Sequence, residues 1–329
     1  MPSRKHDEID QAEIPLRIPR HLGDGPSRPG YMPVRLWGLV QVIMKAFPPP
    51  PRKYKNVDLF AGKCAISRSF KAQGYATCSM DIEINELDDI LSPVGFIRTL
   101  YAAIHIARGG LCTMGVVCSS FTQINRGTSG RTAENPLGRE NYPSVAKANL
   151  MLVRAVLIMI TVLHFQGHWM LENPLSSIID LMPRFRKLLD NTVHHRCHTW
   201  LGMFKAPTPK PIKLYSDDPF VQHLHRTLDR SRFAKSGTTI KYKNRAGQTR
   251  FRGSATLKAS QVYPGRFGRE VLHAWETYAR ERPNRMQLLD FSNDPWEDAQ
   301  LSECEAWLET RIQERASKSK ETLMADLAA

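Results

Sequence analysis

The stretch VDLFAGKCA, residues 57–65, is typical of a buried strand that runs into a tight turn and then into a helix. Gly62 allows the backbone to turn, and the helix predicted over 65–73 follows directly. The alternation continues with strands predicted at 76–82, 111–117 and 168–171, helices at 93–107, 144–165 and 265–282, and a hairpin at 238–252. Strands separated by helices of this length form βαβ units. The sequence therefore predicts an α/β fold of three layers, Rossmann-like, with a mostly parallel sheet and a C-terminal antiparallel hairpin.

The ends of the chain differ from this pattern. Residues 1–33 are charged and rich in Pro and Gly, which predicts a disordered N-terminal arm. Residues 34–55 predict a helix and a polyproline linker, so we expect the folded domain over 56–285. Residues 286–329 form a predicted tail with an amphipathic helix, which offers a surface for a protein partner.

The positive charge is concentrated in one segment. The net charge is +14, and residues 184–252 hold sixteen Lys and Arg against four Asp and Glu. Such a basic segment favours a polyanionic partner, most often nucleic acid, and the alternative is a basic surface without a partner. The exposed candidates for this contact are Arg126, Arg131, Lys241, Lys243 and Arg245.

Composition also excludes several classes of protein. With 42% hydrophobic residues the chain is expected to be globular, and neither collagen-like nor a coiled coil. The apolar stretch 150–165 is shorter than a bilayer span and contains Arg154, so we expect a buried helix and no membrane association. Six scattered cysteines without a signal peptide indicate free thiols, no structural metal, and an intracellular location, nuclear or cytoplasmic.

Three predicted strands end on residues suited to chemistry. Ligands in open parallel sheets bind at the carboxyl ends of the strands. Gly62 and Asp81 there suit a nucleoside-containing cofactor, although a tight turn with an exposed acid has the same pattern. Cys118 beside basic residues suits a nucleophile, but a lone cysteine is also a common core residue. Glu172 ends the strand after the long helix.

Taken together, these segments resemble the cytosine-5 DNA methyltransferase family. Residues 58–62 match its S-adenosylmethionine motif, and Phe70 and Gly74 continue the match. The resemblance implies S-adenosyl-L-methionine as cofactor, held by Asp58, Phe60, Ala61, Gly62, Asp81, Asp89 and Ile90.

The same resemblance implies the catalytic residues. Residues 115–122 are similar to the family's Gly-Phe-Pro-Cys-Gln-Pro-Phe-Ser segment, which makes Cys118 the nucleophile. Glu172 matches the glutamate that engages the flipped cytosine. Arg250 and Arg252 fit a Gln-x-Arg-x-Arg pattern, which a basic hairpin also produces by chance. The expected function is therefore methyl transfer to a nucleic acid, with DNA favoured over RNA.

The chain also departs from the family. Cys64 and Ala65 replace two glycines of the cofactor motif, and only four residues separate Arg252 from Leu257, where DNA-modifying members insert a recognition domain. Two alternatives therefore stay open. One is a catalytically inactive protein of the same fold that binds nucleic acid, and the other is a methyltransferase of this fold that acts on another substrate.

Overall fold

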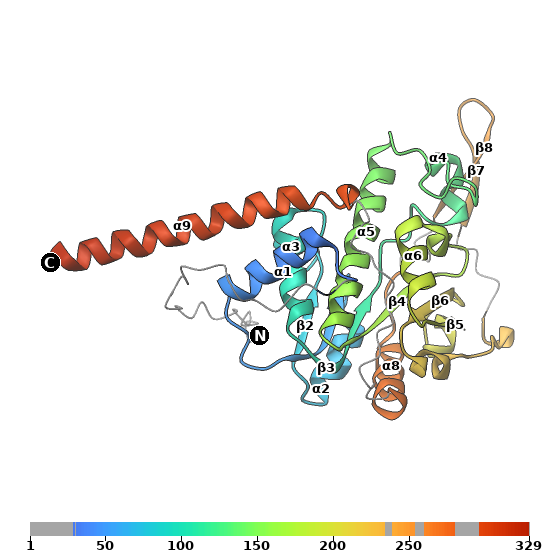
Figure 1. Cartoon of the computed structure of the whole chain (residues 1–329). Coiled ribbons are helices and arrows are strands. Elements are labelled where there is room, and N and C mark those ends of the chain that lie inside the picture. The colour runs from blue at the N-terminus through green and yellow to red at the C-terminus, as the bar shows by residue number, and fades with distance from the viewer. Residues whose placement is uncertain (1–28, 30, 234–238, 254–259, 280–295, 329) are drawn as a thin grey trace, which may run out of the picture.

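A six-stranded sheet with the strand order β2-β1-β3-β4-β6-β5 forms the centre of the protein (Figure 1). The computed structural model describes residues 29, 31–233, 239–253, 260–279 and 296–328. The strands are β1 (Tyr54–Leu59), β2 (Thr77–Met80), β3 (Ile106–Met114), β4 (His168–Pro174), β5 (His195–Trp200) and β6 (Pro211–Ser216). Strands β1 to β4 pair in parallel, and β6 is antiparallel to both β4 and β5. The predicted α/β, mostly parallel, Rossmann-like fold is confirmed.

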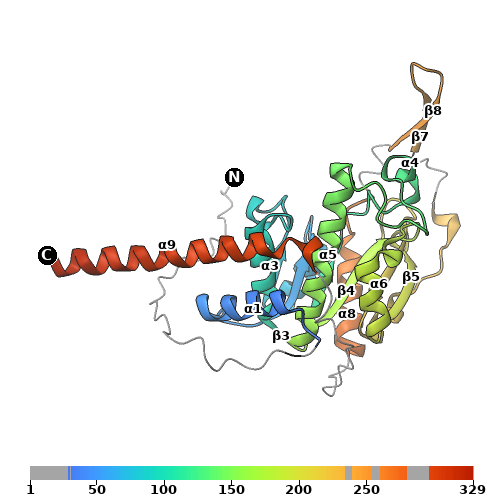
Figure 2. The same cartoon turned by 45° about the horizontal axis from the view of Figure 1, so that its top comes forward.

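The antiparallel part of the sheet differs from the prediction in its location. The predicted hairpin exists, as β7 (Thr239–Lys243) and β8 (Thr249–Gly253), but these strands form a separate two-stranded sheet. The views in Figures 1 and 2 both show this hairpin projecting from the body near α4 (Arg126–Ser129). The antiparallel strand of the main sheet is β6, in a segment for which the sequence pattern predicted no strand.

Helices cover both faces of the sheet. One face is covered by α3 (Pro93–Ile104), α5 (Pro143–His164) and α6 (Pro183–Asn191), and α1 (Val34–Ala46) and the start of α9 (Leu301–Ala328) pack on α3 in the same core. The other face packs against α2 (Ala65–Ala72) and α8 (Gly265–Tyr278). Successive residues of a strand point to opposite faces, so Asp58 and Glu172 lie on the side of α2 and α8, whereas Val57 and Leu171 join the first core.

The long apolar helix α5 is the centre of the first core. It is long and apolar enough to cross a membrane, but 78% of its most apolar window is buried inside the protein. Arg154 on this helix is fully buried, and its guanidinium donates hydrogen bonds to the carbonyl oxygens of Ile90, Ser92 and Ala299, at 2.8–3.1 Å. This charged group therefore joins α5 to the start of α3 and to the segment before α9.

Segments that we expected to flank the domain contribute to this core. In α1 the side chains of Leu36, Val40 and Ile43 are buried, and Leu301 and Leu308 of α9 join the same cluster. The predicted disordered arm falls almost wholly outside the described residues, as does the first part of the predicted tail. Beyond its buried start, α9 extends away from the body (Figure 2).

The order of the strands fixes where a ligand can bind. The chain passes from β1 outward to β2, and then returns to place β3 on the other side of β1. This reversal is the topological switch point of an open α/β sheet, and ligands bind beside it at the carboxyl ends of the strands. The β1–α2 loop (residues 60–64) and Cys118 follow the two strands that flank it.

Candidate functional site

The β1–α2 loop is a tight turn of unusual backbone conformation. Phe60, Gly62 and Cys64 have φ angles of 57°, 50° and 55°, in the left-handed region that favours glycine. Cys64 thus keeps a glycine-like backbone although it carries a side chain. A Cβ atom added at Gly62 would meet no atom within 4 Å, so the space beside this part of the loop is open.

Asp81, which the sequence analysis predicts to bind ribose, lies against this loop. Its Oδ2 accepts a hydrogen bond from the Gly62 N–H at 2.9 Å, and its Oδ1 accepts one from the Glu83 N–H at 2.8 Å. A carboxylate oxygen has two lone pairs, so each oxygen can accept a second bond from a ligand hydroxyl. The structure therefore brings Gly62 and Asp81 together at the carboxyl ends of β1 and β2, beside the switch point.

The carboxylate of Asp58 lies beneath the loop and does not face solvent. Its side chain is 4% exposed and accepts hydrogen bonds from the Thr113 hydroxyl at 2.7 Å and from the Ser67 N–H at 3.2 Å. Burial raises the pKa of this carboxyl group, and the two hydrogen bonds oppose the shift. Asp58 was predicted to bind cofactor directly, and its contacts instead make it a support for α2 and β3.

The other predicted cofactor residues lie between β2 and α3 or within the loop. Asp89 accepts a hydrogen bond from the Leu91 N–H at 2.9 Å through Oδ1, which closes a turn. Ile90 and Ala61 are buried, so their side chains offer little surface to a ligand. Among the described residues, no group of three or more His, Cys, Asp or Glu side chains could hold a metal ion.

Cys118 is half-buried after the end of β3. Burial raises the pKa of its thiol, and the charge of Glu172 raises it further, whereas the charge of Lys210 lowers it. The resting residue is therefore a thiol at neutral pH, and the thiolate is favoured only where positive charge outweighs these effects.

Glu172 is held in a buried pocket by two residues from distant parts of the chain. The side chain is 6% exposed, and its Oε2 accepts a hydrogen bond from the Tyr263 hydroxyl at 2.6 Å. Its Oε1 lies 3.7 Å from the Lys210 Nζ and has no hydrogen-bond partner. Burial and the carboxylate raise the pKa of Tyr263 well above its ordinary value, so its hydroxyl remains a donor.

Tyr263 and Lys210 were not predicted as site residues. Tyr263 precedes α8, and it reaches Glu172 across Gly115, where an added Cβ would come within 2.6 Å of the tyrosine oxygen. Lys210 precedes β6, which is antiparallel to β4 and β5 and therefore begins at the edge of the sheet where those two strands end. Recognising β6 in the sequence would have placed Lys210 at this edge.

The predicted arginines of the Gln-x-Arg-x-Arg pattern lie on the projecting hairpin. Arg250 and Arg252 belong to β8, opposite Tyr242 and Ile240 of β7. The hairpin is separate from the sheet that carries Cys118 and Glu172. A catalytic role for these two arginines stays a prediction.

Arg131 is a correction to the predicted nucleic-acid surface. Its side chain is 3% exposed, and its guanidinium donates to oxygens of Ser120, Pro136, Leu137 and Asn149. Burial lowers the pKa of Arg131 to about 10. Its contacts hold the loop after Cys118 against α5, so the side chain is not available to a phosphate group.

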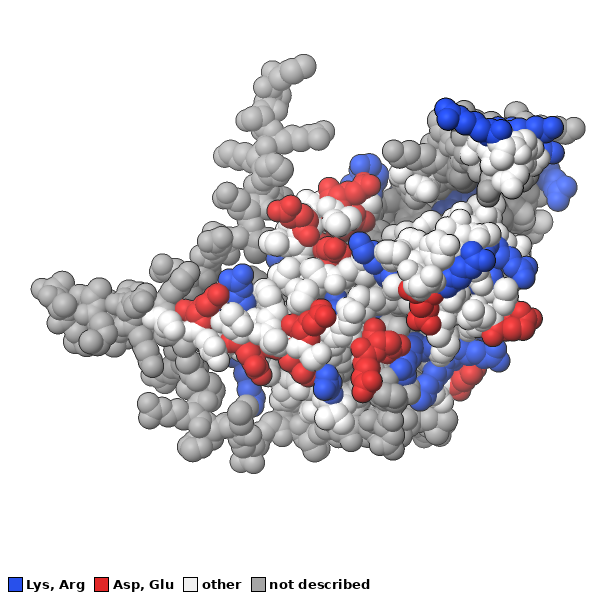
Figure 3. All heavy atoms as spheres, turned by 90° about the horizontal axis from the view of Figure 1, so that it is seen from above, with Lys and Arg blue, Asp and Glu red and all other residues white. Residues whose placement is uncertain are grey.

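Four cations of the basic segment pair with acids from other elements. The ion pairs are Arg184–Asp298 at 3.1 Å, Arg196–Asp180 at 4.0 Å, Lys213–Asp180 at 3.1 Å and Arg226–Glu270 at 2.9 Å. The hairpin differs, because Lys241, Lys243 and Arg245 are exposed and residues 239–253 contain no acid. Figure 3 shows Lys and Arg along the projecting hairpin, while both signs of charge are mixed elsewhere on that face.

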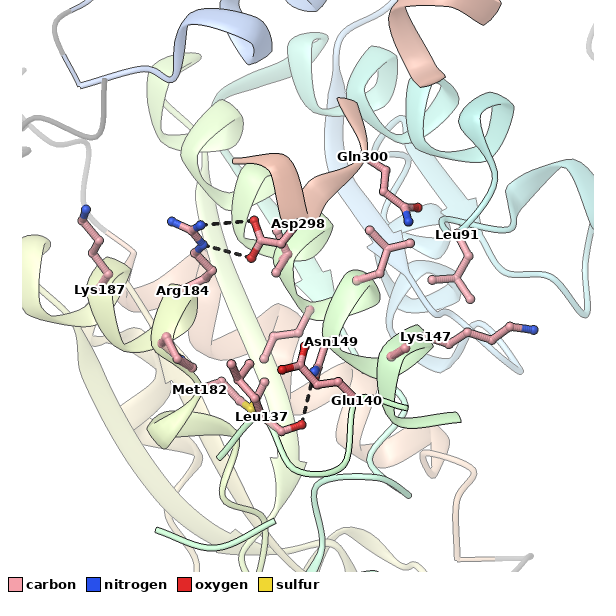
Figure 4. Close-up of a pocket in the computed structure, with 15 residues that line it drawn as sticks. Leu91, Leu137, Glu140, Lys147, Asn149, Met182, Arg184, Lys187, Asp298 and Gln300 are labelled. Carbon is pink, nitrogen blue, oxygen red and sulfur yellow. Dashed lines mark hydrogen bonds and ion pairs between the residues drawn. The ribbon is translucent and has the colours of Figure 1, made fainter. Parts of the chain in front are cut away.

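Two cavities lie outside the Cys118–Glu172 cluster. One of about 750 Å³ is bounded by α5, α6 and the segment before α9, with the Arg184–Asp298 pair at its rim (Figure 4). The other, of about 370 Å³, is lined by the loop after Cys118 and includes Arg126 and Arg131. Neither contains Cys118, Glu172 or the β1–α2 loop, so the site is defined by its side-chain contacts.

Comparisons with known proteins give a distant similarity to solved structures. No protein-family model matches the sequence, and no curated protein matches it. Among solved structures, the chain is similar to the S. pombe Dnmt2 methyltransferase, with a TM-score of 0.27 and 15% identity over 49% of this chain. The aligned part covers 48% of that protein.

We expect Arg131→Met to destabilise the protein by roughly 2–4 kcal/mol, because several buried oxygens lose their donor. The measurement is urea unfolding, and the matched control is Arg126→Met, which removes an exposed arginine of the same loop and should change stability by less than about 0.5 kcal/mol. Equal stability of the two variants would show that the Arg131 contacts do not hold the loop.

Proposed function

We propose that this chain is an S-adenosylmethionine-dependent methyltransferase that acts on nucleic acid through Cys118. The observation that carries the proposal is the gathering of four features at the carboxyl edge of one parallel sheet. These are the β1–α2 loop, Asp81 hydrogen-bonded to it, Cys118, and a buried Glu172 with one oxygen unpartnered. A buried acceptor without a protein partner can accept a hydrogen bond from a ligand.

The residues around the loop fit the cofactor. The open space beside Gly62 allows a ligand to approach the backbone, and Asp81 offers free lone pairs to ribose hydroxyls. Phe60 lies at the end of β1 in the same turn, and Asp89 follows β2. When bound, the cofactor supplies an electrophilic methyl group.

The chemistry of a pyrimidine explains the other two residues. Carbon 5 becomes nucleophilic only after a thiolate adds at carbon 6, and this is the role of Cys118. Addition of the thiolate pushes electron density onto ring nitrogen 3, and the Glu172 carboxyl group delivers a proton to that nitrogen through the oxygen that has no partner in the protein, which compensates the charge. Tyr263 fixes the other oxygen, so the carboxylate is held in one orientation.

The hairpin supplies the surface for the nucleic acid. Its exposed cations have no acidic partner among the described residues, which suits contacts with backbone phosphates. The resemblance to cytosine-5 DNA methyltransferases favours DNA over RNA as the substrate. Arg126, exposed at the start of α4 in the loop after Cys118, is a further candidate contact.

A second candidate function is a non-catalytic protein that binds nucleic acid. The observation in its favour is the thiol of Cys118, whose pKa is raised by burial and by Glu172, so that little thiolate forms at neutral pH. A third is methyl transfer to another substrate, in which Cys118 is a core residue. The experiments below separate the three.

We expect the parent protein to bind S-adenosylhomocysteine in a calorimetric titration. Asp81→Ala should weaken this binding by roughly 1–3 kcal/mol, because a hydrogen bond to a charged group is lost. Glu83→Ala is the control, since Glu83 is an exposed acid two residues away whose main-chain N–H is kept. Equal affinities of the two variants would remove Asp81 from the site, and no binding by the parent would exclude the catalytic functions.

Cys118→Ser should abolish methyl transfer from labelled S-adenosylmethionine to mixed-sequence DNA, because a serine hydroxyl is a far weaker nucleophile than a thiolate. Cys78→Ser should retain the parent rate. The parent rate should rise as the pH increases above 7, because the raised pKa of Cys118 leaves its thiol protonated until alkaline pH. Methyl transfer by Cys118→Ser at the parent rate would support the third candidate.

Replacing Lys241, Lys243 and Arg245 with Ala should weaken binding to all DNA sequences alike. The slope of log affinity against log salt should flatten by up to about 0.9 per lost phosphate contact on duplex DNA. The matched control replaces Arg35, Lys45 and Lys53, which are also exposed and give the same change in net charge. Equal slopes for the two triple variants would exclude the hairpin as the contact surface.

A further inference from the structure

We propose that the nucleic acid bound by this protein is single-stranded DNA, and that Tyr242 of the projecting hairpin stacks on one of its bases. The inference deepens the proposed function, because it rests on the hairpin as the contact surface and names the form of the substrate. In a duplex the faces of the bases are covered by their neighbours, and a protein reaches them only after a base leaves the stack. A surface that combines exposed apolar side chains with cations therefore suits a single strand.

Tyr242 is an exposed aromatic residue between two exposed lysines. Its side chain is 44% exposed, and Lys241 and Lys243 on either side of it in β7 are exposed as well. Successive residues of a strand point to opposite faces, so the ring belongs to one face of the hairpin and the two lysines to the other. Residues 239–253 contain five Lys and Arg and no acid. The hairpin thus offers an aromatic ring and uncompensated positive charge on one narrow ribbon.

The turn of the hairpin fixes the position of this ring. The Asn244 side-chain oxygen accepts hydrogen bonds from the N–H groups of Ala246 at 3.1 Å and Gln248 at 2.9 Å. These bonds hold the register in which Tyr242 lies opposite Arg250. An aromatic residue and an arginine at facing positions form the combination with which proteins bind the bases and backbone of single strands.

Exposed apolar side chains also occur in the loops that carry the proposed catalytic residues. Val117 is 50% exposed and Ile124 is 69% exposed in the loop after β3, and Leu175 is 37% exposed directly after β4. A β-bridge between Thr122 and Ser177 joins the two loops. These apolar groups therefore lie at the edge of the sheet where the reacting base has to enter.

The exposure of Ile124 is built into a well-packed loop. Phe121 of the same loop is buried, and its N–H donates to the Cys118 carbonyl oxygen at 2.9 Å. Ile124 is followed closely by Arg126, which is exposed at the start of α4. Figures 1 and 2 both show the hairpin near α4. The hairpin and the loop after Cys118 thus repeat one pattern, an exposed apolar side chain beside an exposed cation.

A role of Tyr242 in the hairpin alone makes a different prediction. Single exposed apolar residues are common on protein surfaces, and an aromatic residue can serve only to stabilise a strand through its cross-strand neighbour. Removal of the ring would then weaken the binding of single strands and duplexes alike. If the ring stacks on a base, its removal weakens the binding of the single strand, and the effect disappears when the strand has no bases.

The experiment compares three DNA probes by fluorescence anisotropy at one salt concentration. They are a mixed-sequence strand of about 16 nucleotides, the upper site size of one single-strand-binding module, its duplex, and the same strand with abasic sites in its central part. The parent should bind the single strand at least about tenfold more tightly than the duplex or the abasic strand, which corresponds to about 1.4 kcal/mol, within the range for one base stacked on an aromatic ring.

Two pairs of variants test the named residues. Tyr242→Ile keeps a side chain suited to a strand and should weaken single-strand binding about tenfold, whereas Tyr242→Phe should keep it. The control is Tyr278→Leu, at a tyrosine of α8 with 39% exposure. Ile124→Ser should weaken single-strand binding about threefold through loss of apolar contact. Its control is Val193→Ser, because Val193 is also 69% exposed and lies before β5, at the other edge of the sheet.

Two results would overturn the inference. One is binding of the duplex by the parent as tightly as the single strand, a measurement that requires no variant. The other is an equal loss of affinity for the single strand and the abasic strand in Tyr242→Ile. Binding requires neither cofactor nor catalysis, so a preference for the single strand without methyl transfer contradicts only the proposed activity. Methyl transfer by a parent protein that prefers the duplex contradicts only the assignment of single-stranded DNA.

Discussion

The buried carboxylate of Asp58 determines how the centre of this fold is assembled. It accepts the Thr113 hydroxyl from β3 and the Ser67 N–H from α2, and so joins three elements at the switch point of the sheet. A buried carboxylate without such donors would cost several kcal/mol, so the three elements must meet in this arrangement. The β1–α2 loop and the segment that carries Cys118 start from the ends of these same strands. The contacts of the Asp58 carboxylate therefore also fix the positions from which the candidate site is built.

The sequence was most informative where a single element has a strong pattern. The apolar run of α5 and the strand–turn–helix at residues 57–65 predicted their structures well. It was least informative for β5 and β6, because Arg196 and Lys213 interrupt their apolar patterns. Arg196 is half-exposed, whereas Lys213 is buried and pairs there with Asp180. The apolar pattern of one segment carries no information about an ion-pair partner that lies in another segment.

The same limit applies to the candidate site. Cys118 and Glu172 follow strands and could be predicted, whereas Tyr263 is 91 residues from Glu172 along the chain and is brought to it only by packing of α8. Arg131 shows the opposite error, since an arginine in a polar loop resembles a surface residue until its buried acceptors are seen. Charge in a sequence therefore indicates chemistry only after burial is known.

The ion pairs of the basic segment have a consequence for the chain during synthesis. Arg184 pairs with Asp298 and Arg226 with Glu270, and these acids are translated after the whole segment 184–252. A nascent chain that ends before these acids therefore leaves Arg184 and Arg226 without these native partners. Ribosomal RNA and other polyanions can then compete for the segment. Completion of the C-terminal region thus both closes the fold and withdraws two cations of the segment from such competition, while the cations of the hairpin stay exposed in the native protein.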